Sequence, residues 1–539
     1  IPAFSTKARR ILLECGSLSW AEINPDIFGS MFQAVIDQEQ RGNLGQHYTS
    51  VSNIMKVIKP LFLDKLWDAL DQARGKEKKL KELLVRLQKI RVFDPACGSG
   101  NFLIIAYKEL RKIEMAVIDA LNEASSQPEM YYSGISLSQF YGIEIDDFAH
   151  EVAILSLWLA EHQMNLEFKD KFGYADATLP LKASGNIVAG NALRLDWKKI
   201  CPQVDARTGK GETYICGNPP FKGWKYRSQE QSESMAEVFE GFRIWKPLDF
   251  VTGWFWKASL LVNDGSAVSY AFVSTNSIVQ GEQIGLLWRP ILNLGLGIEF
   301  CHQPFVWRNN ARENAGVHVV VIGVSKSPKQ RLIYSSANGK VINKSVENIS
   351  PYLIDSKSII VDGLNNPISP RKVMSDGNNY ANSLPLILTT SERDVLLRDE
   401  PQADVWIKKL LGAHEFIKGK DRWCLWLVGI ELDEIRKSMP LVARRVEKTR
   451  LARLDAKDPG AHKLADRPHQ FRDTNNPSKF ILIPRVTSER RKYVPVGFFD
   501  SNVISTNQNL VIENGGLFEA AIIMSRIHID WMKTVAGRL

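Results

Sequence analysis

The pattern of apolar positions gives the N-terminal part of the chain a helical character. Apolar side chains recur at helical spacing in Ile54–Leu70, and Lys76–Ile90 carries leucines at the same spacing with lysines between them. Both segments are therefore expected to form amphipathic helices. Residues 1–44 are assigned to a helical connector that precedes them.

From Arg91 to about Val324, short β-rich runs alternate with helical patterns. The expected strands are Val92–Phe93, Tyr141–Ile145, Thr213–Cys216, Ala267–Ser274, Gly297–Cys301 and Val317–Val324. The expected helices are Phe102–Leu121, Phe148–Met164, Phe250–Leu261 and Gln283–Leu292. This alternation predicts an α/β fold, a parallel sheet with helices on both faces.

The pattern changes again at a polar stretch rich in Gly, Pro and Asn, Asp362–Ser383, which is typical of a domain boundary. We expect one domain over residues 45–362 and a second over 384–539. The second ends in an amphipathic pattern, Leu517–Val535, that predicts one helix.

Positive charge is concentrated in the second domain. The whole chain has a net charge of +9. Between Leu441 and Tyr493 there are 14 Lys and Arg against six acids, so this segment alone contributes +8. Such a field favours a polyanionic partner, although a solvated basic face is the simpler interpretation of a charge run.

Composition excludes secreted and membrane proteins. The chain is 44% hydrophobic and 24% charged, and no stretch approaches the roughly 18 apolar residues of a membrane span. No signal peptide precedes the first helix, and the start at Ile1 without Met suggests a fragment or a processed chain. Six scattered cysteines without a Cys-x-x-Cys pair indicate a reducing compartment and no structural zinc.

A glycine-rich turn follows the first expected strand, in the sequence Phe-Asp-Pro-Ala-Cys-Gly-Ser-Gly-Asn-Phe at 93–102. The spacing matches neither a dinucleotide nor a P-loop motif. Asp94 could instead pair with an ammonium group, and Glu144, at the end of the next strand, suits the two hydroxyls of a ribose. An amino group and a ribose together describe S-adenosylmethionine, whereas an ordinary strand–helix turn is the simpler alternative.

A second motif, Asn218-Pro219-Pro220-Phe221, follows another expected strand. The prolines restrict the backbone, so the Asn218 side chain is held at a strand end. Its oxygen and the Pro219 carbonyl could accept the two N–H groups of an exocyclic amine, while Phe221 stacks on the ring. Such positioning suits methylation of an amine conjugated to an aromatic ring, although a simple turn explains the motif alone.

These two motifs together resemble the amino-methyltransferases that act on DNA. The resemblance implies a class I S-adenosylmethionine methyltransferase core with a mostly parallel, seven-stranded sheet. The order of motifs is that of the γ class, and Asn-Pro-Pro-Phe implies N6 of adenine as the target. Two further segments match, Gly45–Ser50 before the cofactor motif and Gly190–Leu193, where Asn191 replaces the acid of many members.

The chain is also similar, over nearly all of its length, to the MmeI-type and YeeA-like restriction–modification proteins. The matching segments are Ser274–Ile278, Phe305–Ala311, Val317–Val320, Arg485–Pro495 and Ser525–Met532. The resemblance implies a monomer in the prokaryotic cytoplasm that binds double-stranded DNA, with an N-terminal nuclease domain in the full-length protein. Residues before 45 show no Asp…Glu-x-Lys nuclease signature, so this sequence is expected to be the methyltransferase and recognition portion without the nuclease domain. The resemblance also implies a mixed α/β target-recognition domain, truncated at its C-terminus, over 384–539.

The resemblance assigns roles to individual residues. The catalytic set is Asn218, Pro219, Pro220 and Phe221. The S-adenosylmethionine set is Tyr48, Thr49, Asp94, Ala96, Gly98, Gly100, Asn101, Phe102, Glu144, Ile145 and Asn191. The expected DNA-binding set is Phe305 or Trp307, either of which could stack on a flipped-out adenine, with Arg444, Arg445, Arg490 and Arg491 on the backbone.

Two other functions share some of these features. RNA and protein-glutamine methyltransferases also use Asn-Pro-Pro-aromatic motifs, but they lack a long basic C-terminal domain. A non-catalytic DNA-binding module that keeps the fold is the third possibility, which the presence of Asp94, Glu144, Asn218 and Phe221 disfavours.

Overall fold

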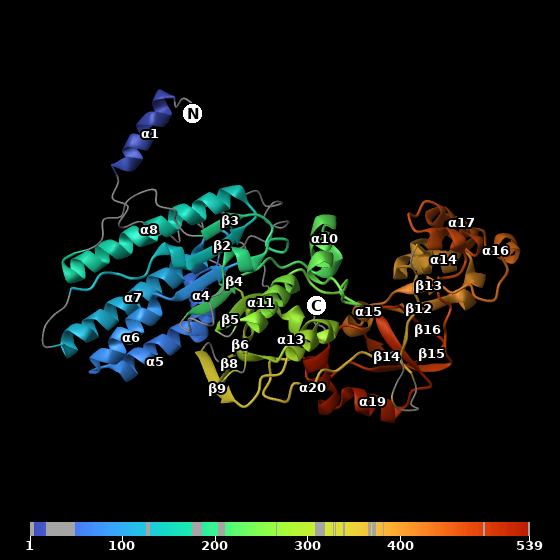
Figure 1. Cartoon of the computed structure of the whole chain (residues 1–539). Coiled ribbons are helices and arrows are strands. Elements are labelled where there is room, and N and C mark those ends of the chain that lie inside the picture. The colour runs from blue at the N-terminus through green and yellow to red at the C-terminus, as the bar shows by residue number, and fades with distance from the viewer. Residues whose placement is uncertain are drawn as a thin grey trace. The chain divides into compact units, whose positions relative to one another are not determined.

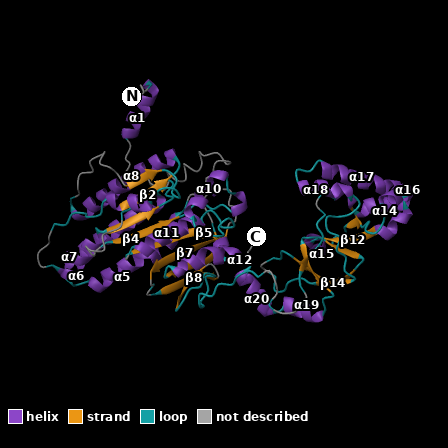
Figure 2. Cartoon of the chain, turned by 45° about the vertical axis from the view of Figure 1, so that its right-hand side comes forward, coloured by secondary structure: helices purple, strands orange, loops and turns teal. Residues whose placement is uncertain are grey.

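The computed structural model divides the chain into two compact units, 1–362 with 537–539, and 363–536. It describes residues 5–17, 49–125, 130–174, 186–202, 211–265, 267–307, 318–326, 328, 330–337, 340–364, 368, 373–380, 382–488 and 491–536. Each unit is an α/β structure with its own sheets (Figures 1 and 2).

The first unit is built on a nine-stranded sheet with the strand order β3-β2-β1-β4-β5-β7-β6-β8-β9. Its strands are β1 (Ile90–Asp94), β2 (Phe140–Glu144), β3 (Asn186–Ala189), β4 (Glu212–Gly217), β5 (Val268–Thr275), β6 (Leu296–Val306), β7 (His318–Lys326), β8 (Arg331–Ala337) and β9 (Lys340–Val346). Strands β1 to β5 are parallel, and β7 runs antiparallel to both of its neighbours, β5 and β6. The expected seven-stranded, mostly parallel sheet is confirmed, and β8 and β9 extend it at one edge.

Helices cover both faces of this sheet (Figure 2). They are α4 (Val51–Ile58), α5 (Asp64–Ala73), α6 (Glu77–Leu87), α7 (Asn101–Ala124), α8 (Asp147–Phe172), α9 (Trp197–Ile200), α10 (Gln229–Val238), α11 (Thr252–Asp264), α12 (Gly281–Gln283) and α13 (Arg289–Asn293). A separate helix, α1 (Thr6–Gly16), has no buried residue. The helical pattern predicted over Ile54–Leu70 is confirmed, with one irregularity: a π-helical turn, Lys59–Leu63, joins α4 to α5, and Pro60 in it has no N–H to continue the α-helical pattern.

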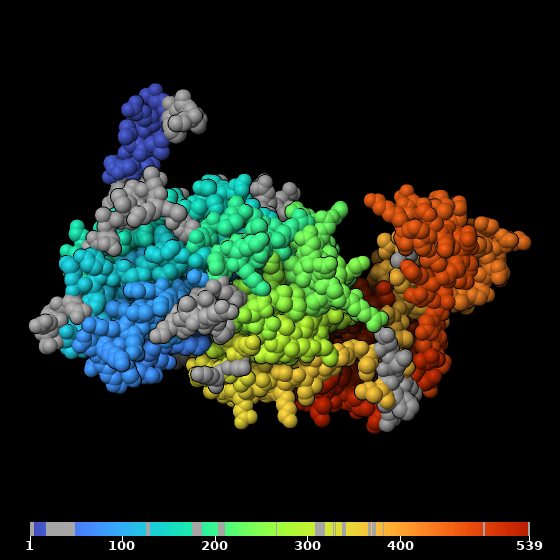
Figure 3. Space-filling model, viewed as in Figure 1, coloured from blue at the N-terminus to red at the C-terminus, as the bar shows by residue number. Residues whose placement is uncertain are grey.

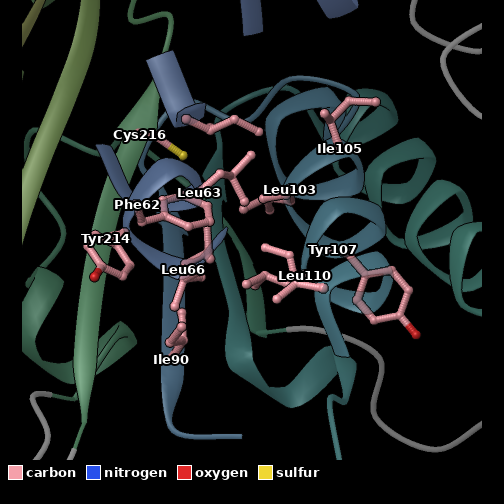
Figure 4. Packing of buried hydrophobic residues seen from close by; sticks show 14 of the residues in the cluster. Phe62, Leu63, Leu66, Ile90, Leu103, Ile105, Tyr107, Leu110, Tyr214 and Cys216 are labelled. Carbon is pink, nitrogen blue, oxygen red and sulfur yellow. The ribbon is translucent and has the colours of Figure 1, made fainter. Parts of the chain in front are cut away.

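Alternate residues of the central strands face opposite cores. Val92 and Tyr214 belong to the core under α4–α8, whereas Phe93 and Ile215 belong to the core under α11 and α13. Figure 4 shows the first core, in which the ring of Phe62 stacks on that of Tyr214 with their centroids 4.8 Å apart. Burial on both faces explains why the central strands are nearly continuous apolar runs.

The second unit contains two four-stranded sheets of mixed α/β character. One has the order β10 (Ser375–Asp376), β17 (Asn509–Glu513), β14 (Lys479–Pro484) and β15 (Gly497–Asp500). The other has the order β11 (Ile387–Leu388), β13 (Trp423–Leu425), β12 (Ile407–Leu411) and β16 (Val503–Ser505). The helices of this unit are α14 (Thr390–Asp399), α15 (Ala413–Lys418), α16 (Leu432–Ser438), α17 (Pro440–Leu454), α18 (Pro459–Lys463), α19 (Leu517–Met524) and α20 (Arg526–Val535).

The prediction of one helix over Leu517–Val535 is wrong. Ser525 is extended (φ −64°, ψ 150°), and its hydroxyl accepts a hydrogen bond from His528 N at 3.2 Å, which caps the start of α20. Helical spacing continues across Ser525, but a serine side chain that caps a new helix competes with continuation of the old one.

Candidate active site

The glycine turn lies between the end of β1 and the start of α7. Gly98 and Gly100 have φ values of +53° and +85°, which side chains other than glycine rarely adopt. At Gly100 a Cβ would also approach Ala153 of α8 to 3.3 Å. The turn therefore brings bare backbone to the carboxyl edge of the sheet, where parallel α/β proteins bind their ligands.

Two buried carboxylates flank this turn. Glu144, at the end of β2, accepts hydrogen bonds from Gly98 N at 2.8 Å and Asp146 N at 3.0 Å. Asp94 accepts one from Ala96 N through Oδ1 at 3.0 Å. Its Oδ2 is buried and has no hydrogen-bond partner in the described part of the chain. Asp94 thus holds an unused acceptor beside the glycine backbone.

Burial governs the protonation of both acids. Burial is the main cause that raises the pKa of Asp94 to about 8; the Ala96 N–H opposes this shift, and the nearby Glu144 adds to it. Burial also raises the pKa of Glu144, and the backbone N–H groups of Asp146, Gly98 and Ile145 oppose this shift. A buried carboxyl group with a free acceptor is suited to a cationic ligand, because the ligand charge would stabilise the ionised form.

The Asn-Pro-Pro-Phe motif follows β4 and lies next to Asp94. A Cβ on Gly217 would lie 2.4 Å from Asp94 Oδ1, so glycine is needed for this close approach. Asn218 donates through Nδ2 to the hydroxyl of Thr49 at 3.1 Å. Its Oδ1 is buried and accepts no hydrogen bond from the described residues. The two predicted sites are therefore one site, with one free acceptor on each of two neighbouring strands.

The remaining residues of the predicted cofactor set occupy varied surroundings. Ala96 is half-buried and Ile145 is exposed, whereas the ring of Phe102 is packed in the core under α7. Asn101 is buried and its Oδ1 has no partner in the described chain. Tyr48 lies outside the described residues.

The Asn191 side chain forms one hydrogen bond within its own loop and one to α10. Its Oδ1 accepts from Leu193 N at 2.9 Å, and its Nδ2 donates to Ser234 Oγ of α10 at 3.2 Å. The amide therefore holds the loop after β3 in shape and ties it to α10, which favours a structural role for the side chain.

Lys257 of α11 organises the same loop, a role that the sequence analysis missed. Its ammonium group donates to the carbonyl oxygens of Ala192, Leu193 and Leu195 at 2.8, 2.9 and 2.6 Å. Burial lowers its pKa to about 8. One lysine in the otherwise uncharged run of the predicted helix Phe250–Leu261 was the available signal.

The same helix also holds the glycine turn. Trp254, one turn before Lys257, donates through Nε1 to the Pro95 carbonyl at 3.1 Å. Helix α11 thus fixes two loops that are far apart in sequence, the one after β1 and the one after β3.

The two aromatic candidates for base stacking are adjacent at the end of β6. Trp307 is only 6% exposed, and its Nε1 has no partner in the described chain. Phe305 is half-buried, with the Lys56 ammonium 5.0 Å from its ring centroid. The two ring centroids are 6.2 Å apart, so the rings are neighbours at the end of β6.

The predicted backbone-binding arginines of the second unit differ in availability. Arg444 is exposed on α17. Arg445, beside it, donates to the Pro385 carbonyl at 3.0 Å and pairs with Glu392 at 2.8 Å, contacts that favour a structural role. Arg491 is half-buried, and Arg490 lies outside the described residues.

Two absences hold for the described residues. None of their helices combines the length and apolar character that crossing a membrane requires. No three His, Cys, Asp or Glu side chains among them gather in an arrangement able to hold a metal ion.

Two family models match the chain. The MmeI DNA-methyltransferase domain matches residues 70–335, and the MmeI target recognition domain matches residues 355–539. Each model falls within, or nearly within, one of the two compact units.

Individual proteins show the same similarity. DNA methyltransferase A of Bacillus subtilis is 44% identical over 99% of this chain, which spans 60% of that protein. A putative type II restriction enzyme and methyltransferase of Methanocaldococcus jannaschii is 36% identical over 26% of this chain and 14% of its own length. Among solved structures, the type IIL restriction-modification enzyme MmeI in complex with DNA is 38% identical, with a TM-score of 0.87 over 99% of this chain and 71% of that one.

Proposed function

This chain belongs to the MmeI family, and on that premise we propose that it methylates N6 of adenine in a specific duplex DNA sequence. The methyl donor is S-adenosylmethionine, and the activity is the modification part of a restriction–modification protein. The observation that carries the proposal is the pair of buried, unused acceptors, Asp94 Oδ2 and Asn218 Oδ1, on neighbouring strand ends.

The residues at the glycine turn fit the cofactor. Asp94 offers a free carboxylate oxygen to its ammonium group, and Gly98 and Gly100 let it approach the backbone. Each Glu144 oxygen accepts one backbone N–H and keeps a further lone pair for a ribose hydroxyl. When bound, the cofactor supplies an electrophilic methyl group on a sulfonium centre.

Asn218 and its neighbours would position the amine that receives the methyl group. Asn218 Oδ1 and the Pro219 carbonyl accept its two N–H groups, which draws the nitrogen lone pair out of conjugation with the ring. Phe221, half-buried and packed against both cores, offers its ring to one face of the base. Positioning and hydrogen bonding therefore supply the catalytic effect, without a general base.

The target adenine must be flipped out of the duplex for this reaction, because its N6 is inaccessible while the base is stacked. Phe305 or Trp307 would contact the flipped base from the side opposite Phe221. Arg444, Arg490 and Arg491 would contact the sugar-phosphate backbone, which positions the second unit but reads no sequence.

The test is transfer of a labelled methyl group from S-adenosylmethionine to unmethylated, mixed-sequence duplex DNA. We expect label on adenine N6 after digestion to nucleosides. The Asn218→Ala variant should lose at least about 100-fold in methyl transfer, the scale of removing one oriented hydrogen-bonding group from an active site. It should bind the cofactor as the wild type does.

Other outcomes separate the alternatives. Label on cytosine N4 would keep the methyltransferase and change its target, and label only on RNA or on protein glutamine would replace DNA as substrate. A wild-type chain that binds no S-adenosylmethionine would sink the proposal.

A further inference from the structure

Two exposed aromatic side chains stand directly after the catalytic motif. Lys222–Arg227 has the sequence Lys-Gly-Trp-Lys-Tyr-Arg, and its Trp224 and Tyr226 are 44% and 77% exposed. Isolated exposed apolar residues are common, but two large rings within three residues form a patch. The exposed residues Arg243, Ile244 and Lys246 come from a second segment, which contacts the first as described below. We call these two segments, 222–227 and 243–246, the aromatic turn.

The aromatic turn is held in a fixed shape. Tyr226 N donates to the Gly223 carbonyl at 2.9 Å, which closes a short 3₁₀ turn. Arg227 Nη2 donates to the Lys246 carbonyl at 2.6 Å, and its guanidinium lies 5.6 Å from the Trp245 ring centroid. The exposed rings are therefore presented by an ordered backbone, which lowers the entropic cost of binding a partner.

Hydrogen bonds anchor the turn at the edge of the sheet that carries Asn218. Asp249 accepts from Trp224 N at 3.0 Å through one oxygen and from Ser277 Oγ at 2.6 Å through the other. Ser277 lies two residues after β5, and β5 is the parallel neighbour of β4, which leads to Asn218. The turn and the catalytic amide are therefore at the carboxyl ends of adjacent strands.

The charge of the turn is positive. Lys222, Lys225, Arg227, Arg243 and Lys246 contribute five cations, and neither segment contains an acid. The acids nearest in sequence are Glu230 on α10, Glu240 just after it, and Asp249, which accepts the hydrogen bonds of Trp224 and Ser277. Two further acids of α10, Glu233 and Glu237, pair with the Arg194 guanidinium at 3.7 and 3.4 Å. In Figure 3 the green surface that includes α10 projects from the body of the first unit.

We propose that the aromatic turn binds the DNA strand around the flipped nucleotide, with Tyr226 stacking on a base that flipping leaves unstacked. The inference rests on the proposed function and names a DNA-binding surface outside the target recognition domain. Flipping exposes the faces of neighbouring bases, and an aromatic ring is a sequence-tolerant partner for such a face. Lys225 and Arg243 would neutralise flanking phosphates.

The stacking role is tested by methyl transfer to unmethylated, mixed-sequence plasmid DNA. We expect Tyr226→Ala to lower the rate at saturating S-adenosylmethionine at least about tenfold, whereas Tyr226→Phe, which keeps the ring, stays within twofold. The dissociation constant for S-adenosylmethionine should be unchanged in both. Tyr132→Ala is the matched control, since Tyr132 is 56% exposed but lies in the loop before β2, away from the carboxyl edge.

The phosphate role is tested by binding of a fluorescein-labelled, mixed-sequence 30-base-pair duplex at several salt concentrations. The Lys225→Ala/Arg243→Ala variant should bind more weakly, and its slope of log affinity against log salt should be shallower by about 2. Wild-type transfer in Tyr226→Ala together with an unchanged slope would overturn the inference. If the wild type methylates no DNA, the proposed function fails. The duplex-binding experiment then decides by itself whether the aromatic turn binds DNA.

Discussion

The side-chain amide of Asn218 donates a hydrogen bond to the hydroxyl of Thr49, a residue 169 positions earlier in the chain, at 3.1 Å. This bond fixes the orientation of the amide, because Nδ2 is occupied and Oδ1 is left as the free acceptor. Thr49 belongs to the segment that the family resemblance assigns to the cofactor, yet its side chain contacts Asn218, the proposed catalytic residue. It would act on the amine through Asn218, as a positioning residue.

We therefore expect Thr49→Val, which removes the hydroxyl and keeps the shape, to lower the rate of methyl transfer about 5- to 10-fold. The scale is that of one hydrogen bond, about 1 kcal/mol. Thr49→Ser should restore most of the rate, and the affinity for S-adenosylmethionine should change little in either variant. A Thr49→Val enzyme with wild-type turnover would show that Asn218 is oriented by other contacts.

The raised pKa of Asp94 predicts that cofactor binding releases a proton. Burial raises this pKa to about 8, so below pH 8 the free protein holds the carboxyl group largely protonated. The cofactor ammonium needs the ionised form, so affinity should rise as the pH increases from about 6 to 8. Calorimetry at pH 7 in two buffers of different ionisation enthalpy measures the proton directly.

The Asp94→Asn variant is the control for this linkage, and it should bind weakly and release no proton. The same shift acts on folding. A carboxyl group whose pKa is raised in the folded state gives its full contribution to stability below its unfolded pKa of about 4, and that contribution is lost as the pH rises through 8. Equal heats in both buffers for the wild type would contradict the linkage.

The contacts of Lys257 predict that its replacement weakens only the binding of the cofactor. Lys257→Met removes three hydrogen bonds to the loop carbonyls while keeping most of the side-chain volume. We expect the affinity for S-adenosylmethionine to fall about tenfold or more, since the loop after β3 loses three hydrogen bonds and, among the described residues, only the Ala192 carbonyl keeps another side-chain partner, Trp197 Nε1. Binding of a mixed-sequence duplex should be unaffected.

Lys198→Met is a matched control, because Lys198 is exposed and pairs only at the surface, with Asp264 of the same helix α11. If both lysine variants bind the cofactor equally well, the shape of the loop after β3 does not depend on Lys257.

Arg453 predicts a large change in the stability of the second unit. It is fully buried in α17 and donates to the carbonyls of Leu464, Arg467 and Gln470 and to Ser383 Oγ, at 2.6 to 2.9 Å. Arg453→Met would remove all four hydrogen bonds of a buried guanidinium group, and we expect it to lower the free energy of unfolding by at least about 3 kcal/mol.

Denaturant unfolding of the full chain measures this loss, with Arg450→Met as the control. Arg450 lies on the same helix but forms a half-exposed pair with Glu447, so its removal should lower the free energy of unfolding far less than the removal of Arg453. A similar loss in both variants would mean that helix propensity, and not the buried hydrogen bonds, governs α17.

The sequence by itself determined the features that depend on local patterns. Apolar periodicity and turn chemistry predict the positions of β1, β2 and β4, the glycine turn with Asp94, and the motif Asn218-Pro219-Pro220-Phe221. The acids and amides at strand ends could be assigned to one edge in advance, because parallel strands must place their carboxyl ends together.

Only the tertiary structure decided which side chains meet. Three sets of hydrogen bonds join residues that no local pattern connects: the bond from Asn218 to Thr49, the bonds from Lys257 to three carbonyls, and the bonds from Arg453 to its four acceptors. Strands β8 and β9 and the helix break at Ser525 were missed for the same reason. A short strand or a cap is stabilised by its distant partners or by one hydrogen bond, and apolar spacing along the chain records neither.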